Sequence, residues 1–291
     1  MAELRTDLTL EAAEKLAVGG KNLQQLEGVR VKEGRHSGYA VTSVAVENEQ
    51  GSCALGKPEG RYITVDLRPY FQRQEDFFSR GVSCIAGQLQ QLLPQIKHSC
   101  VLAVGLGNRA MVCDAVGPFA VENLLVTRHM VAEAPQQFAD FTPVAALATG
   151  VVGQTGVETL ELIAGTVQRI RPAAVIVIDA LCACSRHRLC ATVQLSDTGL
   201  APGSGVGNHR SAINAETLGV PVVAVGVPTV MAGAVLAHEL TGHDAQGGSD
   251  LFVTPRDVDS RVRELSRLLG YSITAALQPK MTLGDITGLL G

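Results

Sequence analysis

The sequence contains no tryptophan, and aromatic residues make up only 4% of its 291 residues. It also has no apolar run of the about 20 residues that a membrane-spanning helix needs. The first residues, Met1 to Arg5, include no apolar core of the kind found in secretory signal peptides. We therefore expect a cytoplasmic protein with no membrane partner.

Cysteine pairs with the spacing of a zinc ribbon or knuckle are absent, although the chain has seven cysteines. An odd number cannot pair completely within one chain, so we expect reduced, mostly buried thiols. Positive charge is not in excess either, since 24 Lys and Arg stand against 28 Asp and Glu, a net charge of −4. Without a basic stripe, we expect no direct nucleic-acid partner.

Several cofactor and catalytic motifs are incomplete. The glycines at 203, 205 and 207 do not have the G-x-G-x-x-G spacing of a dinucleotide site, and no P-loop ending follows them. Ser204 lacks the flanking glycines of a serine-hydrolase elbow. His238 and His243 are five positions apart, whereas zinc ligation from one helical face requires positions i and i+4. We therefore predict no cofactor and no metal.

Hydrophobic residues, in contrast, make up 46% of the chain, which is enough for a large core. Six short apolar segments have the character of strands: 39–46, 61–67, 100–107, 143–150, 173–180 and 220–227. The last four are apolar almost throughout, as is typical of parallel strands covered on both faces. The first two are separated by a Gly- and Pro-containing segment and predict a hairpin within residues 38–67.

Three amphipathic segments, 74–93, 157–170 and 255–269, are predicted to form helices. At the last of them, we expect Thr254 to cap the helix and Gly270 to end it. The alternation of strands and helices predicts an α/β fold of three layers, with a largely parallel central sheet between helices. No linker interrupts the pattern, so we expect a single domain over residues 1–291.

The tripeptide Asp197-Thr198-Gly199 also occurs in pepsin-like and retroviral aspartic proteases. Those enzymes need two such loops, because their active unit is a pair of carboxylates that share one proton. Only one copy is present here, and the retroviral enzymes that form the pair by dimerising are short all-β chains. We therefore interpret Asp197 as a turn or cap residue rather than a pepsin-type catalyst.

Two other carboxylates follow apolar strands. Asp179 ends the segment "AAVIVID", and Asp114 lies in the loop after "CVLAVGLG". Ligands of open α/β sheets bind outside the carboxyl ends of the strands. If the two strands are neighbours, both carboxylates reach one crevice, where one can activate a water while the other donates a proton. The alternative is that Asp179 caps a helix and Asp114 is a turn residue.

Nine blocks of the sequence, in this order, resemble the germination protease family of spore-forming bacteria: 5–14, 56–66, 104–118, 126–129, 150–159, 175–181, 197–210, 226–230 and 251–259. The endopeptidase of that family begins the breakdown of small acid-soluble spore proteins when spores germinate. The resemblance implies an α/β fold related to the hydrogenase-maturation endopeptidases. It also implies a homotetramer made first as a zymogen and located in the cytoplasm of the spore core.

The resemblance further implies an atypical aspartic mechanism with two catalytic aspartates, which match Asp114 and Asp179. The block around Asp197 then forms a loop near the site, where Asp197 positions a neighbour or the substrate backbone. Among the remaining residues of the matching blocks, Asn108, Arg128 and His129 are supporting candidates that line the same crevice. The substrates implied are small acid-soluble spore proteins.

Two departures from the family pattern leave alternatives open. Family precursors carry a pro-segment before the "RTDL" block, but only Met1 to Leu4 precede Arg5 here. Either that segment was removed or this member has almost none, so zymogen control stays open. The cysteine-rich "CACSRHR" after Asp179 can bind a metal adventitiously. A metal-assisted peptidase, with His209 or His129 completing the site, and a catalytically silent binding or assembly protein are therefore the alternatives.

Overall fold

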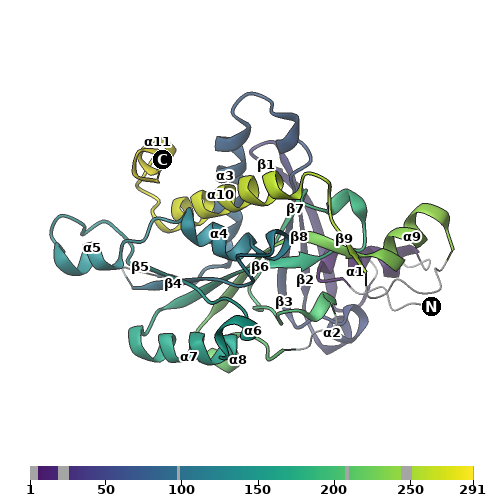
Figure 1. Cartoon of the computed structure of the whole chain (residues 1–291), viewed down its shortest axis with the longest axis horizontal. Coiled ribbons are helices and arrows are strands. Elements are labelled where there is room, and N and C mark those ends of the chain that lie inside the picture. Colours follow the sequence, from purple (N-terminus) through teal and green to yellow (C-terminus); the bar gives the residue numbers. More distant parts are fainter. Residues whose placement is uncertain (1–5, 19–25, 97–98, 207–209, 244–250, 291) are drawn as a thin grey trace.

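The computed structural model describes residues 6–18, 26–96, 99–206, 210–243 and 251–290. Within these ranges nine strands form one sheet in the order β1-β2-β3-β7-β8-β6-β4-β5, with β9 paired to β8. Helices cover both faces of this sheet (Figure 1), which confirms the three-layer α/β prediction. The strands are β1 (Val29–His36), β2 (Tyr39–Val46), β3 (Gly60–Asp66), β4 (Val101–Gly105), β5 (Val144–Ala148), β6 (Ala174–Cys182), β7 (Thr192–Ser196), β8 (Val222–Ala232) and β9 (Phe252–Val253).

The four segments predicted as parallel strands form the parallel half of the sheet, in the order β8-β6-β4-β5. Their apolar side chains are divided between the two faces, because successive residues of a strand point in opposite directions. On β6, for example, Val175 and Val177 pack on one face, while Ile176 and Ile178 pack on the other. This burial on both faces explains why these strands have no polar alternation.

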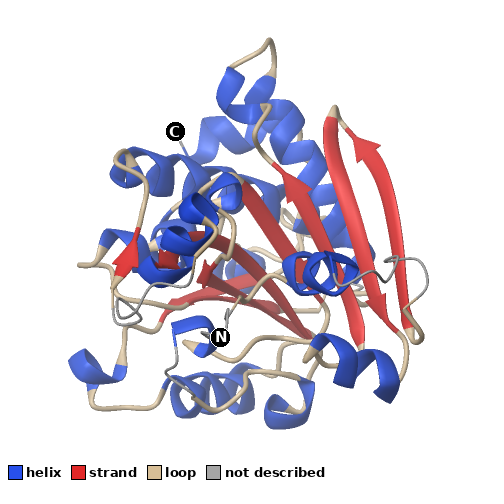
Figure 2. Ribbon diagram, turned by 90° about the vertical axis from the view of Figure 1, so that its right-hand side faces the viewer, coloured by secondary structure: helices blue, strands red, loops and turns tan. Residues whose placement is uncertain are grey.

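The other half of the sheet is antiparallel, and its long strands run side by side in Figure 2. β2 and β3 pair with each other as predicted. Their connection is not a simple turn, however, because Glu49–Leu55 forms the helix α2, capped by the Asn48 side chain. β1 and β7 extend the pair on either side and were not predicted from the sequence.

The helices lie in two layers. α3, α4 and α10 cover one face of the sheet; α7 and α8 cover the parallel half of the other face, and α1 and α2 cover its antiparallel half. The helix bounds are α1 (Thr9–Val18), α2 (Glu49–Leu55), α3 (Phe77–Leu92), α4 (Val116–Glu122), α5 (Arg128–Glu133), α6 (Val152–Thr155), α7 (Thr159–Ile170), α8 (Ala215–Leu218), α9 (Gly233–Thr241), α10 (Val258–Leu277) and α11 (Leu283–Leu290).

Helix α10 corrects one prediction. It runs through Gly270 to Leu277 instead of ending at the glycine. A Cβ atom at position 270 would lie 2.4 Å from the carbonyl oxygen of Asn123, at the end of α4, so the glycine permits close packing of the two helices. Thr254 does not cap α10; its hydroxyl donates to the carbonyl oxygen of Thr229 at 2.8 Å.

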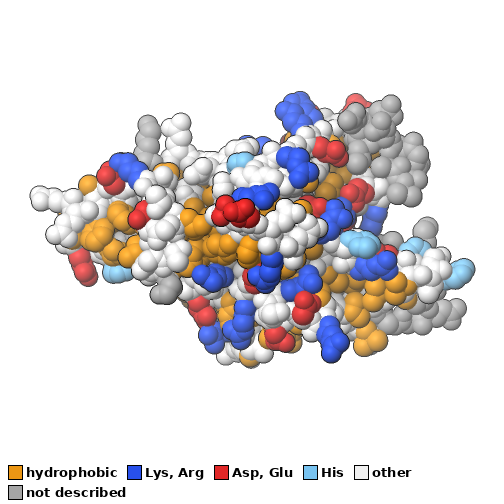
Figure 3. Space-filling view, turned by 90° about the horizontal axis from the view of Figure 1, so that it is seen from above, with side chains coloured by type: hydrophobic (Ala, Val, Ile, Leu, Met, Phe, Trp, Pro, Cys, Tyr) orange, Lys and Arg blue, Asp and Glu red, His pale blue; other side chains and the backbone are white. Residues whose placement is uncertain are grey.

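The outer face of α10 combines arginines with aromatic rings. Arg261 lies over Phe71, and Arg267 lies over Phe78, each with its guanidinium carbon about 5 Å from the ring centroid. Seen from above, Lys and Arg side chains are mixed with acidic and apolar ones (Figure 3). Among the helices that the structure describes, none combines the length and the apolar character needed to cross a membrane.

Candidate active site

Asp179 lies on β6 at the carboxyl edge of the parallel strands. The sequence predicted that Asp179 ends this strand, but β6 continues to Cys182 because β8 also continues and keeps pairing with it. The other neighbour, β4, stops earlier, with its last residue Gly105 level with Ile178. Asp179 is therefore the first residue of β6 beyond β4. Alternation along the strand turns its side chain to the same face as Val175 and Val177.

Asp114 ends a short 3-10 helix, η3 (Val112–Asp114), between β4 and α4. Its Oδ2 accepts a hydrogen bond of 2.7 Å from the backbone N–H of Asn108. The side-chain oxygen of Asn108 in turn accepts from Nε2 of Gln154 on α6, at 2.8 Å. Asn108 thus supports Asp114 through its backbone, while its side chain fastens this loop to α6.

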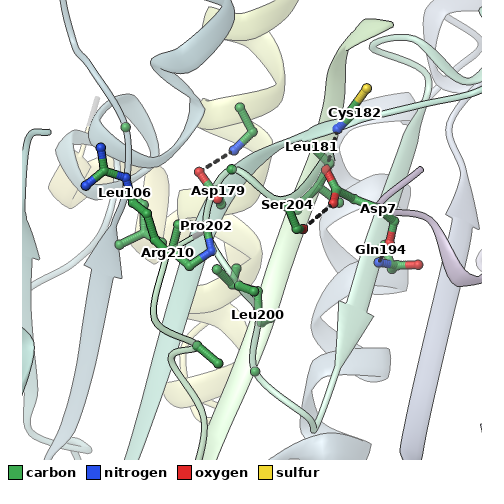
Figure 4. A pocket seen from close by; sticks show the side chains of 18 of the residues that line it. Asp7, Leu106, Asp179, Leu181, Cys182, Gln194, Leu200, Pro202, Ser204 and Arg210 are labelled. Atoms are coloured by element: carbon green, nitrogen blue, oxygen red, sulfur yellow. Dashed lines mark hydrogen bonds between the residues drawn. The ribbon is translucent and has the colours of Figure 1, made fainter. Parts of the chain in front are cut away.

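Asp114 and Asp179 line the same cavity, whose volume is about 600 Å³. The cavity lies beyond the ends of β4 and β6 and is walled by the segments 56–58, 150–152 and 198–204. Figure 4 shows Asp179 with Pro202 and Arg210 on one side and with Asp7 and Ser204 on the other. Much of the remaining wall is apolar, including Leu106, Leu181 and Leu200. The cavity is therefore an apolar crevice that holds a few converging polar groups.

The surroundings of the two carboxyl groups separate their titrations. Asp179 is only 7% exposed. Burial raises its pKa well above the ordinary value, and the negative charges of Asp114 and Asp7 raise that pKa further. Burial also raises the pKa of Asp114, but the Asn108 N–H opposes this by stabilising the ionised form. Asp114 therefore ionises first, and Asp179 keeps its proton to higher pH.

Asp197 and the pair Arg128 and His129 lie outside this cavity. Asp197 accepts two hydrogen bonds from Arg61 on β3, at 2.7 Å from its backbone N–H and 2.8 Å from Nε. Arg128 and His129 are exposed on α5, which begins beside the amino end of β5, where Thr127 N–H donates to the carbonyl oxygen of Val144. Figure 1 shows α5 at the far left of the molecule. The expectation that Arg128 and His129 line the crevice is therefore not supported.

No group of three or more His, Cys, Asp or Glu side chains that could hold a metal ion is found among the described residues. His209, one candidate for completing a metal site, lies outside those residues. Of the cysteines after Asp179, Cys182 lines the cavity, whereas Cys184 contacts Lys15 Nζ at 3.1 Å. All seven cysteines are free thiols, and burial raises the pKa of Cys182 to about 12.

The sequence profile of the germination proteases matches residues 6–243, a range that includes both strand-end aspartates. This chain belongs to the germination protease family. As a family member it is a peptidase. The chain is 36% identical to the germination protease of Caldanaerobacter subterraneus subsp. tengcongensis, over 99% of its own length and 98% of that protein.

Two further germination proteases show how the similarity is distributed. The protein of Clostridium perfringens (strain ATCC 13124) is 36% identical over the full length of both chains. That of Bacillus cereus (strain ATCC 10987) is 41% identical over 78% of this chain and 63% of the relative. Among solved structures, the [NiFe] hydrogenase maturation protease HycI of Thermococcus kodakarensis is similar over 64% of this chain and 98% of its own, with 16% identity and a TM-score of 0.37. We draw no argument from that low score.

Two cavity residues of this germination protease were missed by sequence reasoning. Asp7 lies just before α1, and Lys57 lies between α2 and β3. Burial lowers the pKa of Lys57, although the negative charges of Asp7 and Glu11 oppose that effect. Both residues fall in blocks that resemble the family. Nothing local in either block, however, indicates that Asp7 bonds to Cys182, which lies 175 residues away in the chain. Only the folded chain brings them together.

Proposed function

We propose that this chain is an endopeptidase of the atypical aspartic type, in which Asp114 and Asp179 share the work of activating water. The observation that carries the proposal is that both carboxyl groups line one cavity while their surroundings push their pKa values apart. A pair with one ionised and one protonated member has the acid and the base that peptide hydrolysis needs.

The separation of the two titrations supports a division of roles between the two groups. The Asp114 carboxylate takes a proton from a water molecule, whose oxygen attacks the carbonyl carbon of the scissile peptide. The Asp179 carboxylic acid donates its proton to the carbonyl oxygen as that oxygen gains negative charge. When the tetrahedral intermediate collapses, the C–N bond breaks, the amine leaves with the proton from Asp114, and Asp179 recovers its own. The atoms and protons balance without any further group.

The substrates that we propose are small acid-soluble spore proteins, from the resemblance to germination proteases. Action in the spore core and assembly as a homotetramer from a zymogen belong to the same proposal. The test is to incubate the purified chain with such a protein, with and without EDTA, and to identify the products by mass spectrometry. We expect discrete cuts at a rate that EDTA does not change. Loss of cleavage in EDTA alone would favour the metal-assisted peptidase, and binding without cleavage would favour a silent member.

Asp197→Asn separates this mechanism from a pepsin-type one. Asp197 does not line the cavity and is held by Arg61, so we expect the variant to keep kcat/KM within about tenfold of the unmutated chain. A pepsin-type carboxylate would instead lose about 10²- to 10⁴-fold on the same change. Cleavage rates measured on one spore-protein substrate under identical conditions distinguish the two results.

A further inference from the structure

Asp7 is a third carboxylate in the cavity, and the mechanism above does not use it. It belongs to the segment that precedes α1, far in the chain from β4 and β6. In Figure 4 its side chain lies on the Ser204 side of Asp179, next to Cys182. A half-buried carboxylate beside two others requires compensating contacts, because like charges in one crevice repel one another.

The contacts of Asp7 hold it in one place. Its Oδ2 accepts from the backbone N–H of Cys182 at 2.8 Å, and its own N–H donates to the carbonyl oxygen of Cys182 at 3.0 Å. Its Oδ1 accepts from the hydroxyl of Ser204 at 2.7 Å. Its carbonyl oxygen accepts from Lys57 Nζ and from Gln194 Nε2, both at 3.1 Å. Two bonds to its carboxylate and three to its backbone fix Asp7, so its carboxylate can hold Cys182 and Ser204 in defined positions.

Those neighbours belong to the walls around Asp179. The pairing of β6 with β8 shifts register between Leu181 and Cys182, so the end of β6 is irregular where Asp7 binds it. Ser204 belongs to the 198–204 segment, which forms another part of the cavity wall. A Cβ atom at position 205 would lie 2.2 Å from Asp7 Oδ2, so only glycine lets this loop pack against the carboxylate. Asp7 therefore links the end of β6 to the glycine-rich loop.

We propose that Asp7 is a positioning residue of the peptidase, which fixes the end of β6 and the 200–206 loop around Asp179 and adds a second negative charge to the crevice, beside that of Asp114. This inference rests on the proposed function. Besides this positioning role, Asp7 has an electrostatic effect, because its negative charge raises the pKa of Asp179. Asp7 thus helps Asp179 to remain the proton donor at higher pH.

Other charged or titratable groups also line the cavity, and they determine which control variants the experiment needs. Asp114 is the second carboxylate, and it raises the pKa of Asp179 more than Asp7 does. The remaining charged or titratable groups in the cavity wall are Lys57, Tyr62, Cys113, Cys182 and Arg210. Of these, Lys57 donates from Nζ to the backbone carbonyl oxygen of Asp7, which places its positive charge beside Asp7, where it opposes the effect of the Asp7 carboxylate. Removing either charge should shift the pH profile, in opposite directions.

The experiment measures kcat/KM for spore-protein cleavage against pH in Asp7→Asn, Lys57→Gln and the unmutated chain. Asn can keep the contacts to Cys182 and Ser204 while losing the charge. We expect its alkaline limb to move to lower pH, with activity on that limb roughly two- to tenfold below the unmutated chain, as for one like charge across a partly solvated crevice. We expect Lys57→Gln to move the limb to higher pH. Ser204→Ala, which leaves all charges in place, should raise KM without moving the limb.

Asp140→Asn is the control for net charge, because Asp140 pairs with Lys280 at an exposed site and does not line the cavity. Its pH profile should superimpose on that of the unmutated chain. If the profiles of Asp7→Asn and Lys57→Gln also superimpose, Asp7 has only a structural role and the inference is wrong. Different results would contradict the proposed function: full activity in Asp179→Asn, or no cleavage by the unmutated chain. If Asp7→Asn does not fold, Lys57→Gln tests the inference alone. A shift of its alkaline limb to higher pH supports the inference, and no shift or a shift to lower pH contradicts it.

Discussion

Asp179→Asn is expected to lower kcat/KM for spore-protein cleavage by about 10²- to 10⁴-fold, the contribution typical of general acid–base catalysis. An asparagine amide can donate a hydrogen bond to the substrate carbonyl, but it cannot transfer a proton at neutral pH. Asp114→Asn should lose a similar factor, because it removes the group that takes the proton from water. Single-substrate rates over several pH values measure both losses.

The pH profile of the unmutated chain provides a second signature. Its rate should rise as Asp114 ionises and fall as Asp179 loses its proton. Since the pKa values of both groups are raised, both limbs should lie above the ordinary range of an aspartate. Because the two groups interact, the limbs report apparent pKa values of the pair. A rate that stays constant across the range in which aspartates titrate would contradict the two-carboxylate mechanism.

Asp179→Asn should also separate catalysis from folding. In the unfolded chain an aspartate ionises near a pKa of about 3.9, but burial keeps the proton on Asp179 in the folded protein. Between these two pKa values the folded state binds more protons than the unfolded state, so the free energy of unfolding falls as pH rises. Asparagine has no such dependence. The stability of the variant relative to the unmutated chain should therefore increase with pH above about 4.

Chemical denaturation at two pH values tests this directly. If the Asp179→Asn variant is inactive but at least as stable as the unmutated chain at neutral pH, the loss of activity is a loss of catalysis and not of folding. An inactive variant with a much lower free energy of unfolding at both pH values would show that Asp179 is needed for folding, and the catalytic assignment would lose its support.

Gly117→Ala should be a strongly damaging substitution in the site region. Gly117 lies in the first turn of α4, and a Cβ atom there would be 2.3 Å from the carbonyl oxygen of Leu106 and 2.5 Å from that of Ile178. The Leu106 N–H donates to the Ile178 carbonyl oxygen at 2.8 Å, which joins the loop carrying Asp114 to the strand carrying Asp179. Backbone atoms on both sides cannot move away easily. We expect a loss of about 3 kcal/mol in the free energy of unfolding.

In a chain of this size, that loss lowers Tm by roughly 6–12 °C. The matched control is Gly153→Ala, also in the first turn of a short helix near the cavity, where a Cβ atom would meet nothing within 4 Å. We expect that change to be neutral or stabilising by up to about 1 kcal/mol, since alanine favours helix. Equal Tm values for the two variants would show that the α4–β6 contact is looser than these distances imply.

The elements that sequence reasoning located best were the strands whose side chains pack on both faces of the sheet. The four parallel strands are apolar at nearly every position, because helices cover them on both faces, and this pattern is visible without any partner. The elements that were missed are different. β1 has mixed burial and many polar residues, and β7 alternates polar with apolar residues instead of being apolar throughout. Gly270 was interpreted as a helix end because a glycine that permits close packing has the same local pattern.

The residues Asp114, Asp179 and Asn108 could be predicted because parallel strands present their carboxyl ends at one edge of the sheet. Arg128 and His129 could not be placed in this way. After Asp114 the chain returns through α4 to the amino end of β5, which carries the two residues to the opposite edge of the sheet. Nearness to Asp114 in the sequence therefore did not predict nearness to the cavity.

What the sequence determined by itself was the set of buried strands, the α/β architecture and the two aspartates at the carboxyl edge of the parallel strands, since each depends on local pattern and on general rules of strand order. The tertiary structure alone decided which aspartate holds the proton and where Asp7 lies. Protonation depends on how deeply Asp179 is buried and which charges face it, and those charges come from η3 and from the segment before α1. Such contacts between distant parts of the chain exist only once the sheet has assembled.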